Sequence, residues 1–418
     1  MTLLLELNDL SVRCYRDGEL LHQSPGIAIA EKNVVLGEQA WQQSRLHPQH
    51  THSEFWSKLN TVALHSPNPK VRHHGDLAYL HLLHIQSQLP FNFDDQNVIY
   101  SLPSSMDRES LGLLLGISQQ CGLNTVGLVD HALASMRPYG QDSEFFHLEM
   151  HMNYSVLTRL MRLDNQLQRQ QISLLKDQGW LQAHAKILQF LSDQFIQKTR
   201  FNPRHDAESE QQLFNTIPVW IQQALSQPRI HCEIQGHQID VDSHSLKAAL
   251  RSALPQVCET LANLQNLYLG DRLSRWLPMF SHSGSVESLS KSQQCAAMAS
   301  LSHHLDTHPE GVRLITSLPC DEISSPTATQ ANSTLATHIL WRHQAYPLSG
   351  LYSLSADGDM TAGESASAIL NIQQGKIRTT QSSVSLNQRP LENPPLRTGD
   401  QIRIDGFSEP LTLIEVTR

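Results

Sequence analysis

Short apolar runs separated by tight turns open the chain and predict a meander of β-strands. Leu3–Leu7 and Ser11–Tyr15 are the first two runs, and the Asp-Gly pair at 17–18 has hairpin-turn chemistry. Further short strands are predicted over residues 19–21 and 26–30. Consecutive strands joined by such short turns pair antiparallel, so the N-terminal segment is expected to begin a sheet.

Helical and strand patterns then alternate. Apolar residues at helical spacing predict helices over Asp76–Gln86 and from Ser105 to about Gln120, on either side of the apolar run Asn97–Leu102. A strand over Val126–Val129 is followed by a short helix over Asp130–Met136. This alternation predicts an α/β fold.

The second half of the chain repeats this order of elements less clearly. Phe145–Tyr154 is strand-like, whereas the polar, Gln-rich stretch from Ser155 to Gln197 has helical spacing over Ile172–Phe195. Later predictions are a helix through Ala224, a hairpin over 229–241, a helix over 243–264 and a strand over 267–269. Two lobes, each with a mixed sheet that begins as a meander, are therefore expected.

The character of the sequence changes after Leu301. The Ser-, Thr- and Pro-rich stretch 324–334 is typical of a linker. Beyond it the pattern predicts only short strands, the last two over Gln401–Ile404 and Leu411–Val416. We expect an α/β domain over 1–301, a linker over 302–335 and an all-β module over 336–418.

Composition narrows the possible partners. The 418 residues carry a formal net charge of -9, so the sequence offers no basic field for nucleic acid. No apolar run approaches the roughly 20 residues of a membrane span. Glu6 also stands where a signal peptide would continue its apolar core, which predicts a cytoplasmic protein. Six scattered cysteines form no CxxC pair, and reduced structural thiols are the expectation.

Several segments, taken in order, resemble the actin and heat-shock-chaperone ATPase superfamily, which includes DnaK-like and bacterial-actin-like proteins. Leu3–Arg13 is similar to its first phosphate loop, Val98–Pro103 and Val129–Ala134 to its connecting segment, and Phe146–Asn153 stands where its second phosphate loop should be. Leu267–Pro278 resembles its adenosine-binding turn. The resemblance implies a two-lobed fold with a nucleotide cleft between the lobes.

The loops differ from that family in residues that matter for phosphate. Glycines allow backbone N–H groups to close around phosphate oxygens, yet the first loop reads Glu-Leu-Asn-Asp and the second has no glycine. In this family an acid of the connecting segment orients the attacking water. The resemblance assigns that role to Asp130, as a candidate catalytic residue. The resemblance also implies a degenerate nucleotide cleft, whose candidate lining residues are Glu6, Asn8, Asp9, Glu149, His151, Asn153, Gly270, Asp271 and Ser274.

These departures predict a non-enzymatic pseudo-ATPase that acts as a protein-interaction or assembly subunit, with neither a cofactor nor a metal expected. The alternative is a chaperone-like or actin-like ATPase that binds ATP and Mg²⁺ through altered loops. The side chains of Asn8, Asp9, Met152, Asn153 and Asp271 are expected to point into the space of the phosphates and ribose. Protein partners and a possible oligomer are implied, but their identity is not.

Two other patterns were weighed. Twenty-three histidines include His147 and His151, which alternate with Glu149 as metal ligands can, and the group His303, His304 and His308. A histidine-rich surface or satisfied core histidines is the alternative to a metal site. The tail, with Gly399-Asp400 before a strand, is similar to the end of a forkhead-associated sandwich, but the phosphothreonine-reading segments of that domain are missing.

Overall fold

The computed structural model divides the chain into two compact units, Met1–Ile323 and Ser324–Arg418. The residues that it describes are 2–94, 96–139, 142–280, 286–301, 312 and 314–320, followed by 337–342, 344–348, 350–355, 360–363, 370–373, 376–379, 384–386, 389–390, 401–404 and 411–414. Most of the range predicted to be a linker lies outside the described residues, as do His303, His304 and His308.

The first sheet of the N-terminal unit has the strand order β16-β8-β7-β1-β2-β3. Strand β1 pairs antiparallel with β2 and parallel with β7, so the meander sits beside a parallel half. Asp17 and Gly18 form the β2–β3 turn with φ of 51° and 84°, as Asp-Gly chemistry predicts. The strands are β1 Thr2–Glu6, β2 Val12–Arg16, β3 Glu19–Ser24, β7 Gln96–Leu102, β8 Leu123–Asp130 and β16 Leu314–Ile315.

The second sheet repeats this plan. Its order is β15-β14-β9-β10-β11-β17, with β9 antiparallel to β10 and parallel to β14. The strands are β9 Glu144–Met150, β10 Tyr154–Leu163, β11 Gln166–Lys176, β14 Leu267–Leu269, β15 Val286–Ser288 and β17 Ser317–Pro319. Two mixed sheets and many helices confirm the α/β class predicted from the sequence. Strands β16 and β17 fall inside the range predicted to be a linker.

The long hairpin β10–β11 corrects one prediction. Helical spacing was expected from Ile172 onward, but Ile172 to Lys176 belong to β11, and helix α5 begins only at Trp180. Asp164 and Asn165 turn the chain with φ of 49° and 62°. Strand pairing on both sides of β10 decides the structure here, because it overrides the weak helical period of a glutamine-rich stretch.

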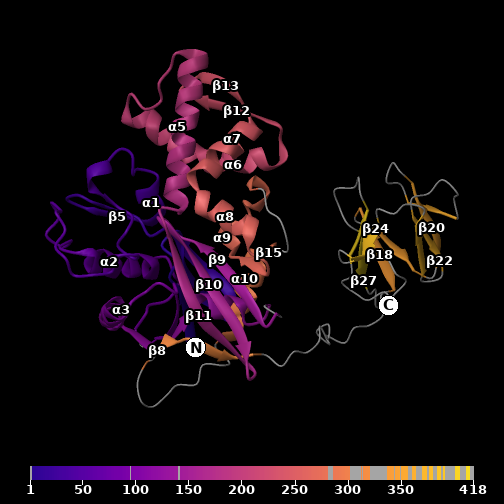
Figure 1. Cartoon of the computed structure of the whole chain (residues 1–418), viewed down its shortest axis with the longest axis horizontal. Coiled ribbons are helices and arrows are strands. Elements are labelled where there is room, and N and C mark those ends of the chain that lie inside the picture. The colour runs from indigo at the N-terminus through magenta and orange to yellow at the C-terminus, as the bar shows by residue number, and fades with distance from the viewer. Residues whose placement is uncertain are drawn as a thin grey trace. The chain divides into compact units, whose positions relative to one another are not determined.

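Helices cover the sheets, and α5, α6 and α7 with the hairpin β12–β13 extend beyond the second sheet (Figure 1). The predicted helix 243–264 is broken into α7 and α8, because Pro255 begins a new helix. Gln235 and Gly236 turn the hairpin β12–β13 with positive φ. The helices are α1 Gly37–Trp41, α2 His74–Ser87, α3 Arg108–Gln120, α4 His131–Met136, α5 Trp180–Thr199, α6 Ala207–Ser226, α7 Ser243–Ala253, α8 Pro255–Asn263, α9 Asp271–Ser274 and α10 Lys291–Leu301. The remaining strands are β4 Ala28–Ala30, β5 Val34–Leu36, β6 Thr51–His52, β12 Arg229–Ile234 and β13 His237–Asp242.

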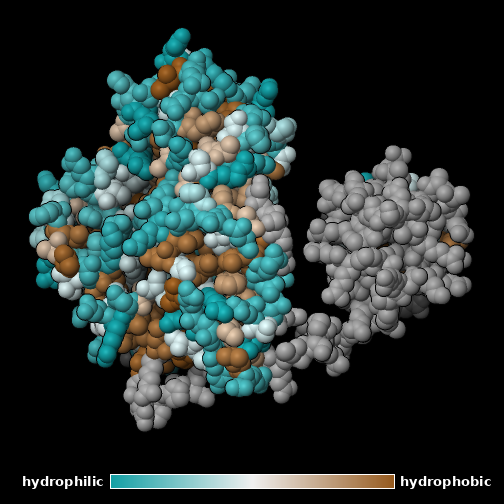
Figure 2. Space-filling model, in the orientation of Figure 1, coloured by the Kyte–Doolittle hydropathy of each residue, from teal (hydrophilic) through white to brown (hydrophobic). Residues whose placement is uncertain are grey.

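A shared apolar core joins the two sheets. Leu4 and Val129 from the first sheet belong to the same buried cluster as Phe145 and Tyr268 from the second, with residues of α4 and α10 between them. On the face drawn in Figure 2, hydrophilic residues cover most of the α5–α7 region, and hydrophobic residues show mainly over the sheets below. The core fixes the ends of β1 and β9 beside each other.

The elements described in the C-terminal unit are all strands. One sheet has the order β19-β18-β27-β26-β24-β25 and the other β21-β20-β22-β23. Their bounds are β18 His338–Trp341, β19 Gln344–Pro347, β20 Leu351–Leu354, β21 Met360–Ala362, β22 Leu370–Gln373, β23 Lys376–Thr379, β24 Val384–Leu386, β25 Arg389–Pro390, β26 Gln401–Ile404 and β27 Leu411–Ile414. In the part of the chain that is described, no helix has the length and apolar character needed to cross a membrane.

Candidate functional site

The turns after β1 and β9 meet directly between the two sheets. The side-chain amide of Asn8 donates to Oε1 of Glu149 and to the carbonyl of Met150, at 3.0 Å each. The backbone N–H of Met152 donates to Oδ1 of Asp9 at 2.8 Å. The structure therefore brings together three acid and amide side chains that were predicted from the two loops, Asn8, Asp9 and Glu149, and the hydrogen bonds join one turn to the other.

A guanidinium group lies between Glu6 and Glu149, the two glutamates of the predicted cleft. Nη1 of Arg272 is 2.5 Å from Oε1 of Glu6 and 3.1 Å from Oε1 of Glu149. Nη2 of the same side chain donates to the carbonyl of Ser11 at 2.6 Å. Helix α9 carries Arg272 to this position, directly after the turn at Gly270, and the side chain is buried.

A second arginine completes the network. Arg13 on β2 makes a two-pronged pair with Asp271, with Nη1 and Nη2 at 3.0 and 2.7 Å from its two carboxylate oxygens. The hydroxyl of Tyr15 donates to Oε2 of Glu6 at 2.8 Å. Two buried arginines thus face three buried acids, which is the balance that makes buried charge tolerable.

The two glutamates differ in their tendency to ionise. Burial alone would raise the pKa of Glu6, but Arg272, Arg13 and the Tyr15 hydroxyl hold that pKa well below its usual range. Burial raises the pKa of Glu149 to about 8, with the charges of Asp271 and Glu6 adding to the effect of burial. Glu6 is therefore the carboxylate of the pair, and Glu149 holds a proton near neutral pH.

Two buried histidines border Glu149. Nε2 of His131 and Nε2 of His147 each lie 3.9 Å from Oε2 of Glu149. Burial lowers the pKa of His131 to about 4 and the pKa of His147 to about 3, so both rings are neutral. Ser101 Oγ holds Nδ1 of His131 at 2.9 Å. The two imidazole rings and the protonated Glu149 carboxyl are thus all uncharged, so this part of the network buries no unpaired charge.

Asp130, the candidate catalytic acid, caps the N-terminus of helix α4 and forms an ion pair with Arg169. Its Oδ1 accepts from the backbone N–H groups of Ala132 and Leu133 and from Ser104 Oγ. Its Oδ2 lies 2.6 Å from Nη1 of Arg169. Both oxygens thus have partners that start helix α4 and hold β11, rather than a place beside Glu6 and Glu149.

The other predicted cleft residues lie in the turn after β9 and in the segment after β14, and each makes its own contacts. His151 stacks on Tyr154 and places Nδ1 3.3 Å from Oδ1 of Asp9. Asn153 instead donates to the carbonyl of Ser53 at 3.4 Å. Ser274 donates to the carbonyl of Leu289 at 2.8 Å. The side chain of Met152 is buried in the core of the second lobe and does not face the network.

Arg13 and Arg272 are the site residues that sequence reasoning missed. Arg13 lies 258 positions from its partner Asp271, so no local pattern pairs them. Arg272 does follow the conspicuous Gly270-Asp271 pair, and an arginine next to an unexpected acid was a usable signal of charge compensation. Four acids assigned to one cleft require positive charge, which the chain itself supplies.

The network does not fit a metal-bound triphosphate. Mg²⁺ needs oxygen ligands at about 2.0–2.1 Å in octahedral geometry, whereas the space between Glu6 and Glu149 holds the Arg272 guanidinium. The backbone N–H of Met152 in the second turn already donates to Asp9. Within the described residues, no three His, Cys, Asp or Glu side chains are arranged to hold a metal ion.

Gly270 permits the close approach of Glu149 to the adenosine-like turn. A Cβ at Gly270 would lie 1.5 Å from Oε2 of Glu149, so Gly270→Ala is expected to push this carboxyl away from Arg272 and Asn8. We expect a loss of about 1–3 kcal/mol in the free energy of unfolding, measured with urea. Gly112→Ala is the control: it adds a Cβ with nothing within 4 Å inside helix α3, and should stabilise by up to about 1 kcal/mol. Equal unfolding midpoints for the two variants would contradict the packing at Gly270.

The chain matches no protein-family model. No curated protein matches it either.

Proposed function

We propose that residues 1–323 are a non-enzymatic pseudo-ATPase of the actin and chaperone type, which acts as a protein-interaction or assembly subunit. The observation that carries this proposal is the position of the Arg272 guanidinium between Glu6 and Glu149. The proposal is supported by two sheets that each begin with a meander and continue into parallel strands. It is also supported by two turns that meet between those sheets.

Arg272 does chemically what a bound cation would do in an active member of such a family. It places a permanent positive charge between two acids from opposite lobes, and it needs no ligand to do so. Arg13 does the same for Asp271. Because the charges balance within the chain, the two lobes are held together without nucleotide, and nucleotide exchange is not needed to change or maintain their contact.

The position of the phosphates is occupied in the same way. Asp9 accepts the Met152 N–H that would otherwise be available to a phosphate oxygen. Any polyphosphate would also have to approach Asp9, and unit charges about 4 Å apart repel by about 4 kcal/mol in a partly screened site. A rigid, ligand-independent core of this kind suits a scaffold for protein partners better than a cycling ATPase. We place this scaffold in the cytoplasm, in line with six free cysteines.

Calorimetry of the full chain with ATP and Mg²⁺ tests the proposal. We expect no binding heat at ligand concentrations up to about 1 mM, because binding would require Arg272 to leave Glu6 and Glu149. Thermal unfolding should agree: a ligand present at about 1,000 times its Kd stabilises by about 4 kcal/mol, and no such rise is expected.

A single result would establish the alternative, an ATPase that binds ATP and Mg²⁺ through altered loops. Micromolar affinity for ATP, with a matching rise in Tm that disappears when Mg²⁺ is chelated, would contradict the pseudo-ATPase. Light scattering with and without nucleotide tests the assembly role. Self-association or partner binding of equal strength in both conditions is expected, and dependence on nucleotide would count against the proposal.

A further inference from the structure

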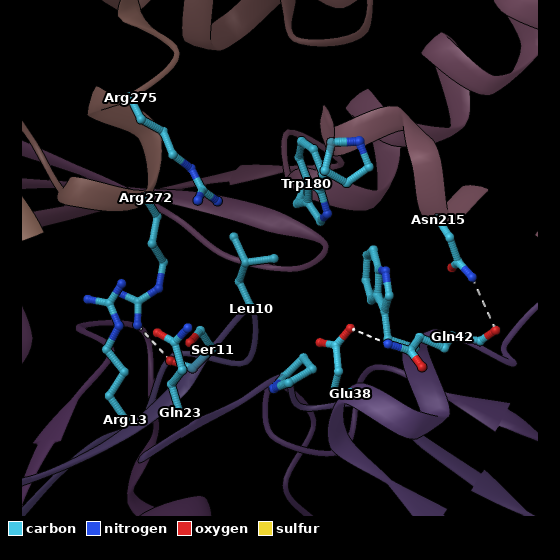
Figure 3. A pocket seen from close by; sticks show the side chains of 13 residues that line it. Leu10, Ser11, Arg13, Gln23, Glu38, Gln42, Trp180, Asn215, Arg272 and Arg275 are labelled. Carbon is cyan, nitrogen blue, oxygen red and sulfur yellow. Dashed lines mark hydrogen bonds between the residues drawn. The ribbon is translucent and has the colours of Figure 1, made fainter. Parts of the chain in front are cut away.

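A cavity of about 470 Å³ lies beside the buried network and separate from its carboxylates. Its walls come from both lobes: the turn after β1, β2, β3 and α1 on one side, and the start of α5, α6 and α9 on the other (Figure 3). A neighbouring cavity of about 440 Å³ shares Arg13, Gln23, Arg272 and Arg275 with it. Cavities of this size accept small organic molecules.

The positive charge of this region exceeds its negative charge. Arg13 and Arg272 are neutralised by the buried acids, but the side chains of Arg275 and Lys291 form no hydrogen bond or ion pair with the described residues, and the Arg275 guanidinium lies 5.5 Å from the centroid of the Trp276 ring. Arg275 lines both cavities, and Figure 3 shows it pointing into the space bounded by Leu10 and Trp180. Burial and the like charges of Arg272 and Arg13 lower the pKa of Arg275. A guanidinium in such a place gains most from an anionic partner.

The opposite part of the first cavity combines two tryptophan rings with the polar side chains of Glu38, Gln42 and Asn215 (Figure 3). Trp41 and Trp180 both line it, and both pack edge-on against the ring of His184, at centroid distances of 5.8 and 5.2 Å. Trp180 also packs on Trp276 at 4.1 Å. Leu10 and two prolines complete this wall. Rings held by other rings give a fixed surface for a flat apolar group.

Contacts above and below keep the cavity formed. The side chain of Gln211 on α6 accepts from the backbone N–H of Arg45 at 2.6 Å, and its amide donates to the carbonyl of Trp41. On the side of the network, Arg272 donates to the carbonyl of Ser11. Because the lobes are joined on both sides of the space, a ligand would enter a preformed site and would not have to close one.

We propose that this cavity binds a small organic anion with a flat apolar body, whose acid group pairs with Arg275 and whose body lies against Trp41 and Trp180. The inference rests on the proposed function, because a network that excludes a metal-bound triphosphate leaves this cavity as the open part of the cleft. A carboxylate and a phosphate monoester share the required chemistry. A phosphate would extend into the second cavity towards Lys291 and the hydroxyl groups of Ser274 and Ser290.

Calorimetric titration with 2-naphthoate, its neutral analogue 2-naphthamide, and 2-naphthyl phosphate tests the proposal on the full chain. We expect 2-naphthoate to bind at least about tenfold more tightly than 2-naphthamide, since a charged hydrogen bond is worth about that factor. Arg275→Gln should remove this preference by weakening 2-naphthoate alone. Arg204→Gln, which changes an exposed arginine between α5 and α6, is the matched control and should leave all affinities unchanged.

A variant of the second cation, Lys291, distinguishes a phosphate ligand from a carboxylate ligand. If Lys291→Gln weakens 2-naphthyl phosphate but not 2-naphthoate, the natural ligand is a phosphate monoester. If the carboxylate binds more tightly and is insensitive to Lys291, the ligand is a carboxylic acid. Absence of binding by both anions at millimolar concentration, or equal affinity in Arg275→Gln, overturns the inference. A separate titration with ATP and Mg²⁺ reports on the pseudo-ATPase proposal alone, so the two failures are distinguishable.

Discussion

The free energy of unfolding is expected to be greatest near pH 6.5 and to fall steeply in acid. Four of the buried histidines in the N-terminal unit matter here: His81 and His184, which pack among aromatic rings, and His131 and His147 beside the network. Burial, the first cause for each, lowers their pKa values to about 3, 3, 4 and 3 respectively. These rings are neutral in the folded chain and take up protons when it unfolds.

The sign follows from proton binding. Between pH 6.5 and about 4, the unfolded histidines are protonated and the folded ones are not, so the unfolded state binds up to four more protons. Acid therefore favours the unfolded state, and the free energy of unfolding falls by about 5 kcal/mol per pH unit for four protons. Glu149 acts in the opposite direction. Burial raises its folded pKa from 4.5 to about 8, and the stability from its proton is lost as pH rises through this range.

The two effects together shape the pH profile. Glu149 reduces the acid slope to about 4 kcal/mol per pH unit, and it also produces a decline of about 1 kcal/mol per pH unit from pH 6.5 to 8. Urea unfolding at intervals between pH 5 and 8 measures both limbs. A flat profile below pH 6.5 would contradict the burial of the histidines as neutral rings.

Variants assign the acid limb to particular rings. His184 packs among Trp41, Trp180 and Phe214, so His184→Phe keeps an aromatic ring there and removes one titrating group. The acid slope should decrease by about 1 kcal/mol per pH unit. His231, which is exposed on β12, is the control, and His231→Gln should leave the slope unchanged.

The turns, the buried strands and one helix start could be predicted from the sequence, because residues close together in the chain determine them. The Asp-Gly pair at 17–18 and the Gln-Gly pair at 235–236 mark hairpins that the structure contains, with φ values that glycine adopts easily. The short apolar runs of the parallel strands were also visible, because buried strands are continuous in their hydrophobicity. Asp130 at the start of α4 has the backbone hydrogen bonds of a helix cap.

Non-local pairing determined what could not be predicted. β10 and β11 carry glutamines and arginines on a half-exposed face, and they are strands because β9 and β17 pair on either side. The Asp-Asn pair at 164–165 was the one local sign of this hairpin. The arginines of the site were missed for the same reason, since Arg13 and Asp271 are neighbours only through the packing of two sheets.

The variant Arg272→Met is expected to cost about 3–5 kcal/mol in the free energy of unfolding, the cost of leaving buried charge without its partner. Methionine keeps much of the length of the side chain but removes the group that lies 2.5 Å from Glu6 and 3.1 Å from Glu149. Urea unfolding at pH 7.5 measures the loss. Arg275→Met is the matched control, three residues further along and without an ion pair among the described residues, and should change stability little. Equal losses in the two variants would refute the central role of Arg272.

Neutralising the stranded acids should reverse part of this loss. Without Arg272, burial is expected to raise the pKa of Glu6 as it already raises that of Glu149, so Glu6 would also hold a proton at lower pH. The difference between the native chain and Arg272→Met should therefore be smaller at pH 5.5 than at pH 7.5. Glu6→Gln in the Arg272→Met background should also recover stability, because the amide carries no charge and its oxygen can still accept from the Tyr15 hydroxyl. A loss that is independent of pH and of residue 6 would mean that Arg272 contributes packing, and not the positive charge that pairs with Glu6.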